Sequence, residues 1–194
     1  MYSTLRSVSL EADKGIVVVH SVKREVDWFD NPVETTGLYA GAIIASTSRE
    51  LLILTLDNAV ENADSIKVTF GDGVEVNGTI KQADQVSGMA IVSVDVTQLE
   101  ESTLESVTVL KLGNSYAVKQ GDIIVALGSP AGMAHSVNYG FVSYVLRNVQ
   151  VADGVTRLLY ADVKGNANKG TFLVNASGAV SYTHLRAHET RRHL

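Results

Sequence analysis

The stretch LGNSYAVKQGDIIVALGSPAGMAHSVNYGFVS, residues 112–143, decides the fold of this chain. Its centre, Ile123–Leu127, is a short apolar run rich in β-branched residues. Turn-forming residues bound this run on both sides, because Gly121-Asp122 precede it and Gly128-Ser129-Pro130 follow it. Such a run predicts a β-strand, and Ser136–Val145 predicts the next one.

Runs of the same kind recur along the rest of the chain, at spacings of roughly eight to twelve residues. This rhythm predicts an all-β protein built as an antiparallel barrel or sandwich. Because the strands fall into two sets, two β-barrels with a cleft between them are the assembly that we expect. The expected strands are Ile16–Val22, Ala42–Ser46, Leu51–Thr55, Ile66–Phe70, Val74–Ile80, Ala90–Val94, Val107–Leu112, Ile123–Leu127, Ser136–Val145, Arg157–Val163 and Thr171–Val174.

Turn and polar segments divide these strands into two sets. Gly71-Asp72-Gly73 predicts a hairpin turn, because glycine tolerates the positive φ angles of tight turns. The polar stretch after Asp95 predicts a connector between the halves. The expected parts are an N-terminal extension (1–15), a first barrel (16–95), a connector (96–106), an incomplete second barrel (107–180) and a tail (181–194).

Four segments in order carry a resemblance to trypsin-like serine proteases of the HtrA/Deg type. Leu51–Ala63 resembles the strand and turn "T-N-x-H-V-V-x-x-A", and Ser87–Val92 resembles "x-D-L-A-V-[LIV]". Leu112–Ser143 is similar to "L-G-[DN]-S … V-G-D … A-I-G-[NS]-P … V-T-x-G-[IVF]-[IV]-S", and Asn168–Asn175 to "N-S-G-G-x-L-[LV]-N". The resemblance implies the chymotrypsin fold of two six-stranded antiparallel β-barrels, with the second barrel truncated.

The resemblance also implies that this chain lacks the catalytic triad. Asn58, Gly88 and Lys169 stand where the family has histidine, aspartate and serine. An asparagine cannot take up a proton near neutral pH, a glycine offers no carboxylate to orient a base, and a lysine supplies an amine in place of a hydroxyl nucleophile. Ala167, Asn168 and Lys169 occupy the positions of the family's oxyanion hole, and Ala167 replaces a glycine there.

Other residues offer two alternative chemistries. Lys169 paired with Ser143 or Ser129 would resemble the dyad of Ser-Lys proteases. Asp57 next to Asn58 would fit a register shifted by one residue, but a solvated turn residue explains it as well. The histidines before the tail, His20 and His135, do not match the position of the family's base.

The last residues, from about Ser181 onward, resemble the translation of a sequencing-library adapter. We therefore expect them to be foreign to the natural protein, which in this family continues with a further strand and commonly a PDZ domain. His184, His188 and His193 have spacings that would suggest a metal site, but they fall within this tail. We expect no metal and no cofactor.

Composition excludes several classes of protein. The formal net charge is −5, and leaving out the tail, with its three Arg and one Glu, brings it to −7. This acidic balance argues against nucleic acid as a partner. The chain has no cysteine and therefore no disulfide framework. No apolar run approaches the roughly 20 residues that span a bilayer, so membrane attachment would need an anchor outside this chain.

These observations favour a proteolytically inactive domain that binds extended peptides or unfolded protein in the bacterial cell envelope. The alternatives are an active endopeptidase with non-standard residues and a structural module, since proteins of this type usually form trimers. Trp28-Phe29 bears on the last alternative. The two rings either cover their own barrel or pack against a neighbouring subunit of a homotrimer.

Overall fold

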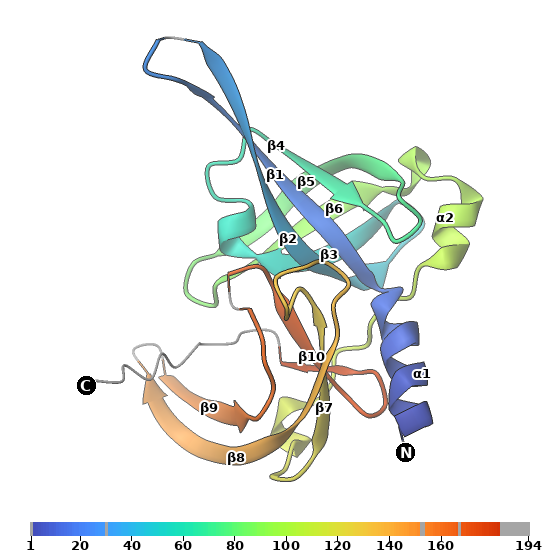
Figure 1. The fold of residues 1–194 in the computed structure, drawn as a ribbon, viewed down its shortest axis with the longest axis vertical. Helices are drawn as coiled ribbons and strands as arrows, with labels where there is room; N and C mark the ends of the chain where they lie inside the picture. The colour runs from blue at the N-terminus through green and yellow to red at the C-terminus, as the bar shows by residue number, and fades with distance from the viewer. Residues whose placement is uncertain (1, 30, 152–153, 167, 183–194) are drawn as a thin grey trace.

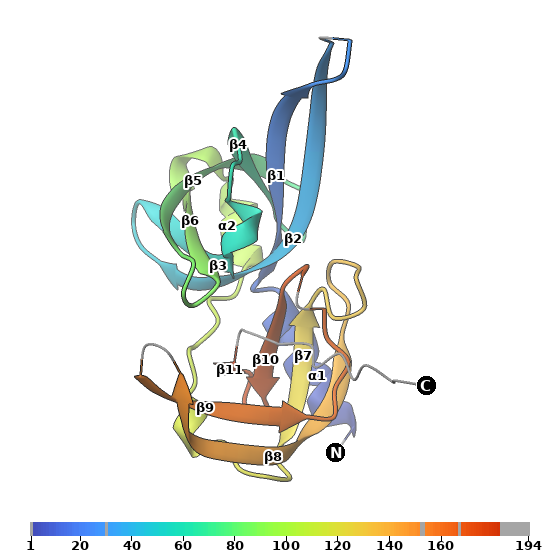
Figure 2. The same cartoon turned by 90° about the vertical axis from the view of Figure 1, so that its left-hand side faces the viewer.

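A computed structural model describes residues 2–29, 31–151, 154–166 and 168–182. Two β-units stack one above the other, and helix α1 runs along the lower unit (Figures 1 and 2). The elements are α1 (Tyr2–Asp13), β1 (Ile16–Val26), β2 (Pro32–Ser46), β3 (Glu50–Leu56), η1 (Asp57–Ala59), β4 (Ser65–Thr69), β5 (Glu75–Asp84), β6 (Met89–Asp95), η2 (Val96–Gln98), α2 (Glu101–Ser106), η3 (Ser115–Ala117), β7 (Ile123–Gly128), β8 (Asn138–Val151), β9 (Gly154–Ala161), β10 (Thr171–Asn175) and β11 (Val180–Tyr182).

The upper unit is a closed antiparallel barrel with strand order β1-β2-β3-β6-β5-β4. Alternate residues of its strands fill the interior, as Val17 and Val19 do in β1 and Val92 and Val94 do in β6. The predicted hairpin at Gly71-Asp72-Gly73 is confirmed, with Gly73 at φ +89° between β4 and β5.

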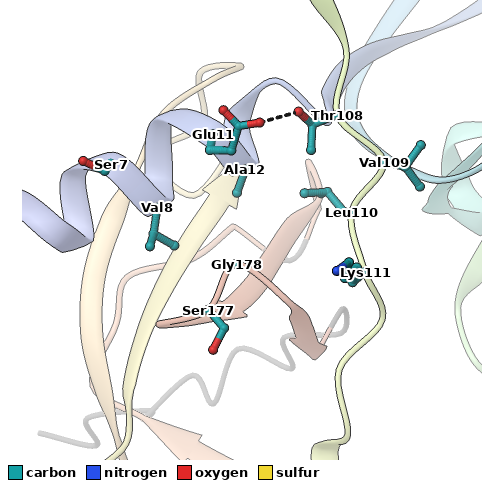
Figure 3. A pocket seen from close by; sticks show the side chains of 10 residues that line it. All are labelled: Ser7, Val8, Glu11, Ala12, Thr108, Val109, Leu110, Lys111, Ser177 and Gly178. Atoms are coloured by element: carbon teal, nitrogen blue, oxygen red, sulfur yellow. Dashed lines mark hydrogen bonds between the residues drawn. The ribbon is translucent and has the colours of Figure 1, made fainter.

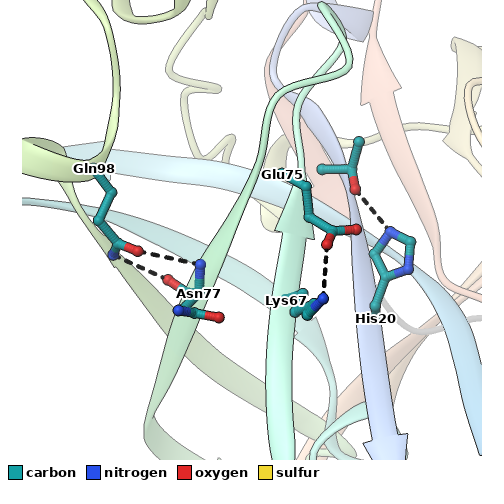
Figure 4. Close-up of polar contacts among 6 residues, drawn as sticks. His20, Lys67, Glu75, Asn77 and Gln98 are labelled. Carbon is teal, nitrogen blue, oxygen red and sulfur yellow. Dashed lines mark hydrogen bonds and ion pairs between the residues drawn. The ribbon is translucent and has the colours of Figure 1, made fainter.

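Polar side chains on the outside of this barrel bond across neighbouring strands (Figure 4). His20 Nε2 lies 2.8 Å from Thr69 Oγ1 across the β1–β4 pair. Lys67 forms an ion pair of 2.9 Å with Glu75 across β4 and β5. His20 is therefore a side chain of the barrel surface.

The hairpin of β1 and β2 projects beyond the barrel (Figure 1). Strand β4 pairs with β1 only as far as Val22, and the hairpin continues without it. Asp27 organises the tip, because its Oδ1 accepts the backbone N–H groups of Phe29 (2.8 Å) and Asn31 (2.9 Å). Trp28 is 96% exposed and Phe29 is 80% exposed. Neither ring covers its own barrel, so that reading of the aromatic pair is wrong.

The lower unit is a five-stranded antiparallel sheet in the order β11-β10-β7-β8-β9, curved into half of a barrel (Figure 2). An all-β trypsin-like fold with an incomplete second barrel is thus confirmed. Strand β11 extends two residues past Val180, into the segment that we expected to be foreign.

The strand predicted over Val107–Leu112 is wrong, since only Leu112 forms a bridge, with Val180. The segment donates its backbone N–H groups one at a time to different elements. Thr108 donates to Lys14 O and Leu110 donates to Ile43 O. Residues 107–112 therefore pass between α1, the barrel and β11, and their backbone groups bond several elements in place of one neighbouring strand.

Helix α1 lies in residues 1–15, for which we expected an N-terminal extension and predicted no helix. Leu5 and Ala12 on one face of it are buried, and the Ser9 hydroxyl lies 2.9 Å from that of Tyr139. No helix among the described residues is long and apolar enough to cross a membrane. The buried residues of α1 join both units in one apolar cluster: Leu5, Ala12, Ile16, Ala40, Ala42, Leu54, Leu110, Val125, Leu127, Phe172, Val174 and Val180.

A second contact of α1 predicts a pH-dependent stability. His135 Nδ1 lies 3.1 Å from Asp13 Oδ2. The hydrogen bond to Asp13 raises the pKa of His135 above its ordinary value of 6.5, against the smaller opposing effect of burial. Because the folded-state pKa is the higher one, this stabilisation is complete below about pH 6.5 and is lost as the pH rises through the raised pKa.

We expect His135→Asn to lower the free energy of unfolding by about 0.5–1 kcal/mol near pH 6 and by less near pH 8.5. Asparagine is the suitable replacement, because His135 has φ +59° and asparagine tolerates that region. Urea unfolding of both proteins at the two pH values measures the difference. If the loss of unfolding free energy caused by His135→Asn grew with pH, the stabilising role of the contact between His135 and Asp13 would be contradicted.

Candidate functional site

Asn58 and Gly88 lie on neighbouring turns at one end of the barrel. Asn58 is in the 3-10 turn η1, directly after β3, and its side chain is exposed. Gly88 ends the turn between β5 and β6, with φ +70°. The Asp57 N–H donates to Gly88 O (3.1 Å), just beyond the last pair of β3 and β6, Leu56 with Met89. The structure thus brings these two positions together.

Lys169 reaches the same end of the barrel from the lower unit. The Ala40 N–H of β2 donates to Lys169 O (2.7 Å), and Ala40 O accepts the Thr55 hydroxyl of β3 (2.9 Å). Gly170 has φ +88°, and a Cβ there would lie 2.9 Å from Ala40 O. Glycine at 170 therefore allows the loop before β10 to press its backbone against β2. In both views this loop lies below β2 and β3 (Figures 1 and 2).

Asn58, Gly88 and Lys169 lie at the same end of the barrel, where it faces the lower unit. Hydrogen bonds between described residues do not connect their side chains into one site. No hydrogen bond joins the side chains of Asn58 and Lys169 in the part of the chain that the structure describes. The Asp57 carboxylate accepts the N–H of Asn58 (2.8 Å) and so acts within its own turn. A shifted register that uses Asp57 as a catalytic acid or base gains no support from this bond.

The loop around Lys169 uses its own backbone donors. The Asn168 N–H donates to Asn166 Oδ1 (3.0 Å), and the Lys169 N–H donates to Asn166 O (3.4 Å). Asn166 is held in turn by Thr171, whose Oγ1 accepts the Asn166 N–H (3.0 Å). The backbone N–H of residue 169, which the resemblance assigns to the oxyanion hole as a donor together with that of residue 167, is therefore engaged within the loop. Ala167 lies outside the described residues.

Sequence reasoning missed Asn166. Its side chain bonds the backbone N–H two residues later, which is the Asx-turn pattern typical of asparagine. The sequence Gly165-Asn166-Ala167-Asn168 was the available signal.

The Lys169 ammonium lies over the ring of Tyr39, 5.2 Å from its centroid. This distance is within the range of cation–π attraction. Among the described residues, no carboxylate lies within ion-pair distance of this ammonium and no hydrogen bond links it to Ser129 or Ser143. The hydroxyl groups proposed for a dyad are therefore not bonded to the lysine.

The other chemistry-bearing groups lie elsewhere. His20 bonds Thr69 on the barrel surface, and His135 bonds Asp13 of α1. Within the described ranges, no three His, Asp or Glu side chains gather as a metal site would require. His184, His188 and His193 lie outside those ranges.

A cavity of about 360 Å³ lies away from these positions, between α1, residues 108–111 and the turn at 177–178 (Figure 3). Its apolar wall includes Val8, Ala12 and Leu110. Glu11 at its rim accepts hydrogen bonds from Thr108 (2.8 Å) and Lys14 (2.7 Å). The cavity contains none of the positions predicted from the sequence.

Residues 39–181 match the family described as the trypsin-like peptidase domain. The chain is similar to a DegP-like periplasmic serine endoprotease of Halomonas elongata, with 34% identity over 148 residues that cover 76% of this chain and 29% of that protein. The periplasmic serine endoprotease DegP of Salmonella typhimurium is 29% identical over 127 residues, 65% of this chain and 25% of DegP. The chain thus spans about a third or less of the length of these relatives.

Solved structures share the fold. The HtrA-type protease AlgW with a tripeptide has a TM-score of 0.67 and 23% identity, covering 93% of this chain and 52% of that one. AlgW with a decapeptide has a TM-score of 0.68 and 19% identity, covering 91% and 57%. The two β-units, the order of the segments and these matches agree, and the chain belongs to the trypsin-like peptidase family, as a protein of the HtrA/Deg type.

Proposed function

We propose that this domain does not cleave peptides and binds them instead, as extended segments of unfolded protein, beside the junction of its two units. This proposal rests on the loop that contains Asn166, Asn168 and Lys169. Two backbone N–H groups of the loop are bonded within the loop itself, and the loop presents a lysine in place of a hydroxyl. A site without base, orienting carboxylate and nucleophile loses about six orders of magnitude in turnover. The peptides bound by AlgW, as its structures are titled, support the choice of ligand.

Strand β2 offers an edge to such a peptide. Ala40 faces Val18 of β1 but donates its N–H away from β1, to Lys169. Because strand residues alternate in direction, Leu38 and Thr36 also point their N–H and C=O groups away from β1. Strand β3 pairs with β2 only from Ala42 to Ser46. Within the described residues, no strand therefore covers this side of β2 at Thr36 and Leu38.

A peptide added along this edge would bind through backbone hydrogen bonds, which need no triad. It would also pass Tyr39 and Lys169, since Ala40 is bonded to Lys169. Leu38 is exposed and supplies an apolar contact beside the edge. The edge and the loop of Lys169 together define the proposed peptide site.

Two substitutions at one position test this edge. Leu38→Ala removes the side chain and keeps the N–H group, whereas Leu38→Pro also removes the N–H group. Proline is tolerated where the N–H faces away from the neighbouring strand. We expect Leu38→Pro to bind a fluorescein-labelled peptide of about ten Val, Leu and Thr residues roughly tenfold more weakly than Leu38→Ala, the value of one backbone hydrogen bond. Equal anisotropy titrations for the two variants would exclude this edge.

The exposed tip of the β1–β2 hairpin favours a second role, assembly with other copies. Exposed aromatic side chains of this size are typical of interfaces, and Asp27 holds the turn that presents Trp28 and Phe29. Light scattering of the wild type and of Trp28→Ser would detect a trimer that depends on the tip. If light scattering showed that the wild type is a monomer, assembly through the tip of the hairpin would be excluded.

We further propose that the protein acts outside the cytoplasm, because the similar DegP proteins are periplasmic. Fractionation of cells that express the full-length protein tests this location, and recovery in the cytosol would contradict it.

A further inference from the structure

We propose that the Lys169 ammonium receives a carboxylate of the bound peptide, so that the site selects peptides with a free C-terminus or an acidic side chain at this point. The inference rests on the peptide binding proposed above and adds the chemistry by which the ligand is chosen.

The position of the ammonium is determined by the packing on both sides of it. The backbone of Lys169 is anchored by the hydrogen bond from Ala40, and Gly170 lies against the same residue. The Tyr39 ring lies over Gly37, which leaves room for it, since an added Cβ there would be 2.8 Å from Tyr39 Cε2. The ammonium lies over this ring and therefore beside β2, the strand whose edge we propose for the peptide.

The charge of this lysine has no anionic partner among the described residues. Four other basic side chains have one, namely Lys14, Arg24, Lys67 and Lys81. The carboxylate on the neighbouring turn, that of Asp57, is not within 4.0 Å of Lys169. The tyrosine ring attracts the ammonium through its π face but accepts none of its three N–H groups in the manner of a carboxylate.

The surroundings favour a charged ligand group over a neutral carbonyl. The backbone N–H groups of Asn168 and Lys169 are engaged within the loop, so they are not free to hold a peptide carbonyl. The ammonium is the charged donor of this loop, and its hydrogen bonds to a carboxylate are shorter and stronger than those to a neutral oxygen. The exposed carboxamides of Asn58 and Asn168 add neutral donors nearby and no negative charge.

Matched peptides test the inference. The labelled peptide is prepared with a free C-terminal carboxylate, with a C-terminal amide, and as amides that carry either Glu or Gln at an internal position. Each is titrated against the wild type, Lys169→Met, Lys169→Arg and Lys111→Met. Methionine keeps the length of the side chain without its charge, arginine keeps the charge, and Lys111 is an exposed control at the rim of the cavity near α1.

We expect the wild type and Lys111→Met to bind at least one carboxylate peptide about tenfold more tightly than its neutral partner. The ratio of the affinities for the carboxylate peptide and its neutral partner should fall to about one in Lys169→Met. It should remain in Lys169→Arg and decrease with added salt. A preference for the free C-terminus identifies the terminal carboxylate, and a preference for Glu identifies a side chain.

The outcomes separate the two proposals. Equal binding of charged and neutral peptides by the wild type overturns the role of Lys169 and leaves the peptide site standing. A charge preference that persists in Lys169→Met also overturns it, because another group then receives the carboxylate. Failure of the wild type to bind any of the peptides overturns the proposed function itself. If Lys169→Met does not fold, loss of the charge preference in Lys169→Gln replaces it as the deciding result.

Discussion

Gly140→Ala is expected to lower the free energy of unfolding by about 3 kcal/mol or more, the upper end for a forced overlap in a packed interior. A Cβ at Gly140 would lie 2.0 Å from the backbone oxygen of Asp162 and 2.7 Å from Val163 Cβ. The clash involves backbone, which cannot rotate away as a long side chain can. Strand β8 and the segment after β9 must therefore separate.

Gly71→Ala is the matched control. A Cβ at Gly71 meets nothing within 4 Å, and we expect a change within about 0.5 kcal/mol. Thermal unfolding followed by circular dichroism should show a fall in Tm of roughly 6–12 °C for Gly140→Ala. Equal Tm values for the two variants would mean that the backbone of Asp162 does not lie against Gly140 as the structure places it. Because this segment leads to Lys169, the same variant should also weaken peptide binding.

The second large effect concerns restoration of the triad residues, which we expect to be insufficient for full activity. The variant Asn58→His, Gly88→Asp, Lys169→Ser should hydrolyse casein at most weakly, and we expect no cleavage by the wild type. An aspartate at position 88 would have to adopt φ +70°, at a cost of about 1 kcal/mol or more, or move the turn. The N–H of residue 169, one of the two oxyanion donors in such a protease, would remain bonded to Asn166 O (3.4 Å), and one missing donor costs about 10²–10³ in rate.

Adding Ala167→Gly to the triple variant restores the family's glycine at the other donor position and should raise the rate by about 10²–10³. A serine-directed covalent inhibitor should abolish this gain, which controls for contaminating proteases. Equal rates with and without Ala167→Gly would show that this donor was available throughout. Cleavage by the wild type that is lost in Lys169→Ala or Ser143→Ala would instead support a Ser-Lys dyad and contradict the proposed function.

The fold could be predicted because its strands are short apolar runs between turn residues. Met89–Asp95 differs from the expected Ala90–Val94 by one residue at each end. Helix α1 was missed although Leu5 and Ala12 have helical spacing, because the helix is short and its pattern weak. The segment 107–112 was mistaken for a strand, since composition does not reveal that its bonds go to several elements.

The candidate site could be predicted from the sequence less completely than the fold. A resemblance assigns positions such as Asn58, Gly88 and Lys169, and these assignments remain predictions. Residue order could not reveal that Tyr39 lies beneath the lysine, because this contact joins residues from different units and depends on tertiary packing. The bond from the Asn168 N–H to the Asn166 side chain is local, and an asparagine in a turn segment was a signal that sequence reasoning could have used.

The docking of α1 has a consequence for synthesis of the protein. Helix α1 is synthesised well before its partners, because His135 and Tyr139 follow it by more than a hundred residues. At ribosomal rates of about 5–20 residues per second, its apolar side stays without these partners for on the order of ten seconds. The nascent chain therefore leaves Leu5 and Ala12, which are buried in the folded protein, in contact with water until these partners have been made.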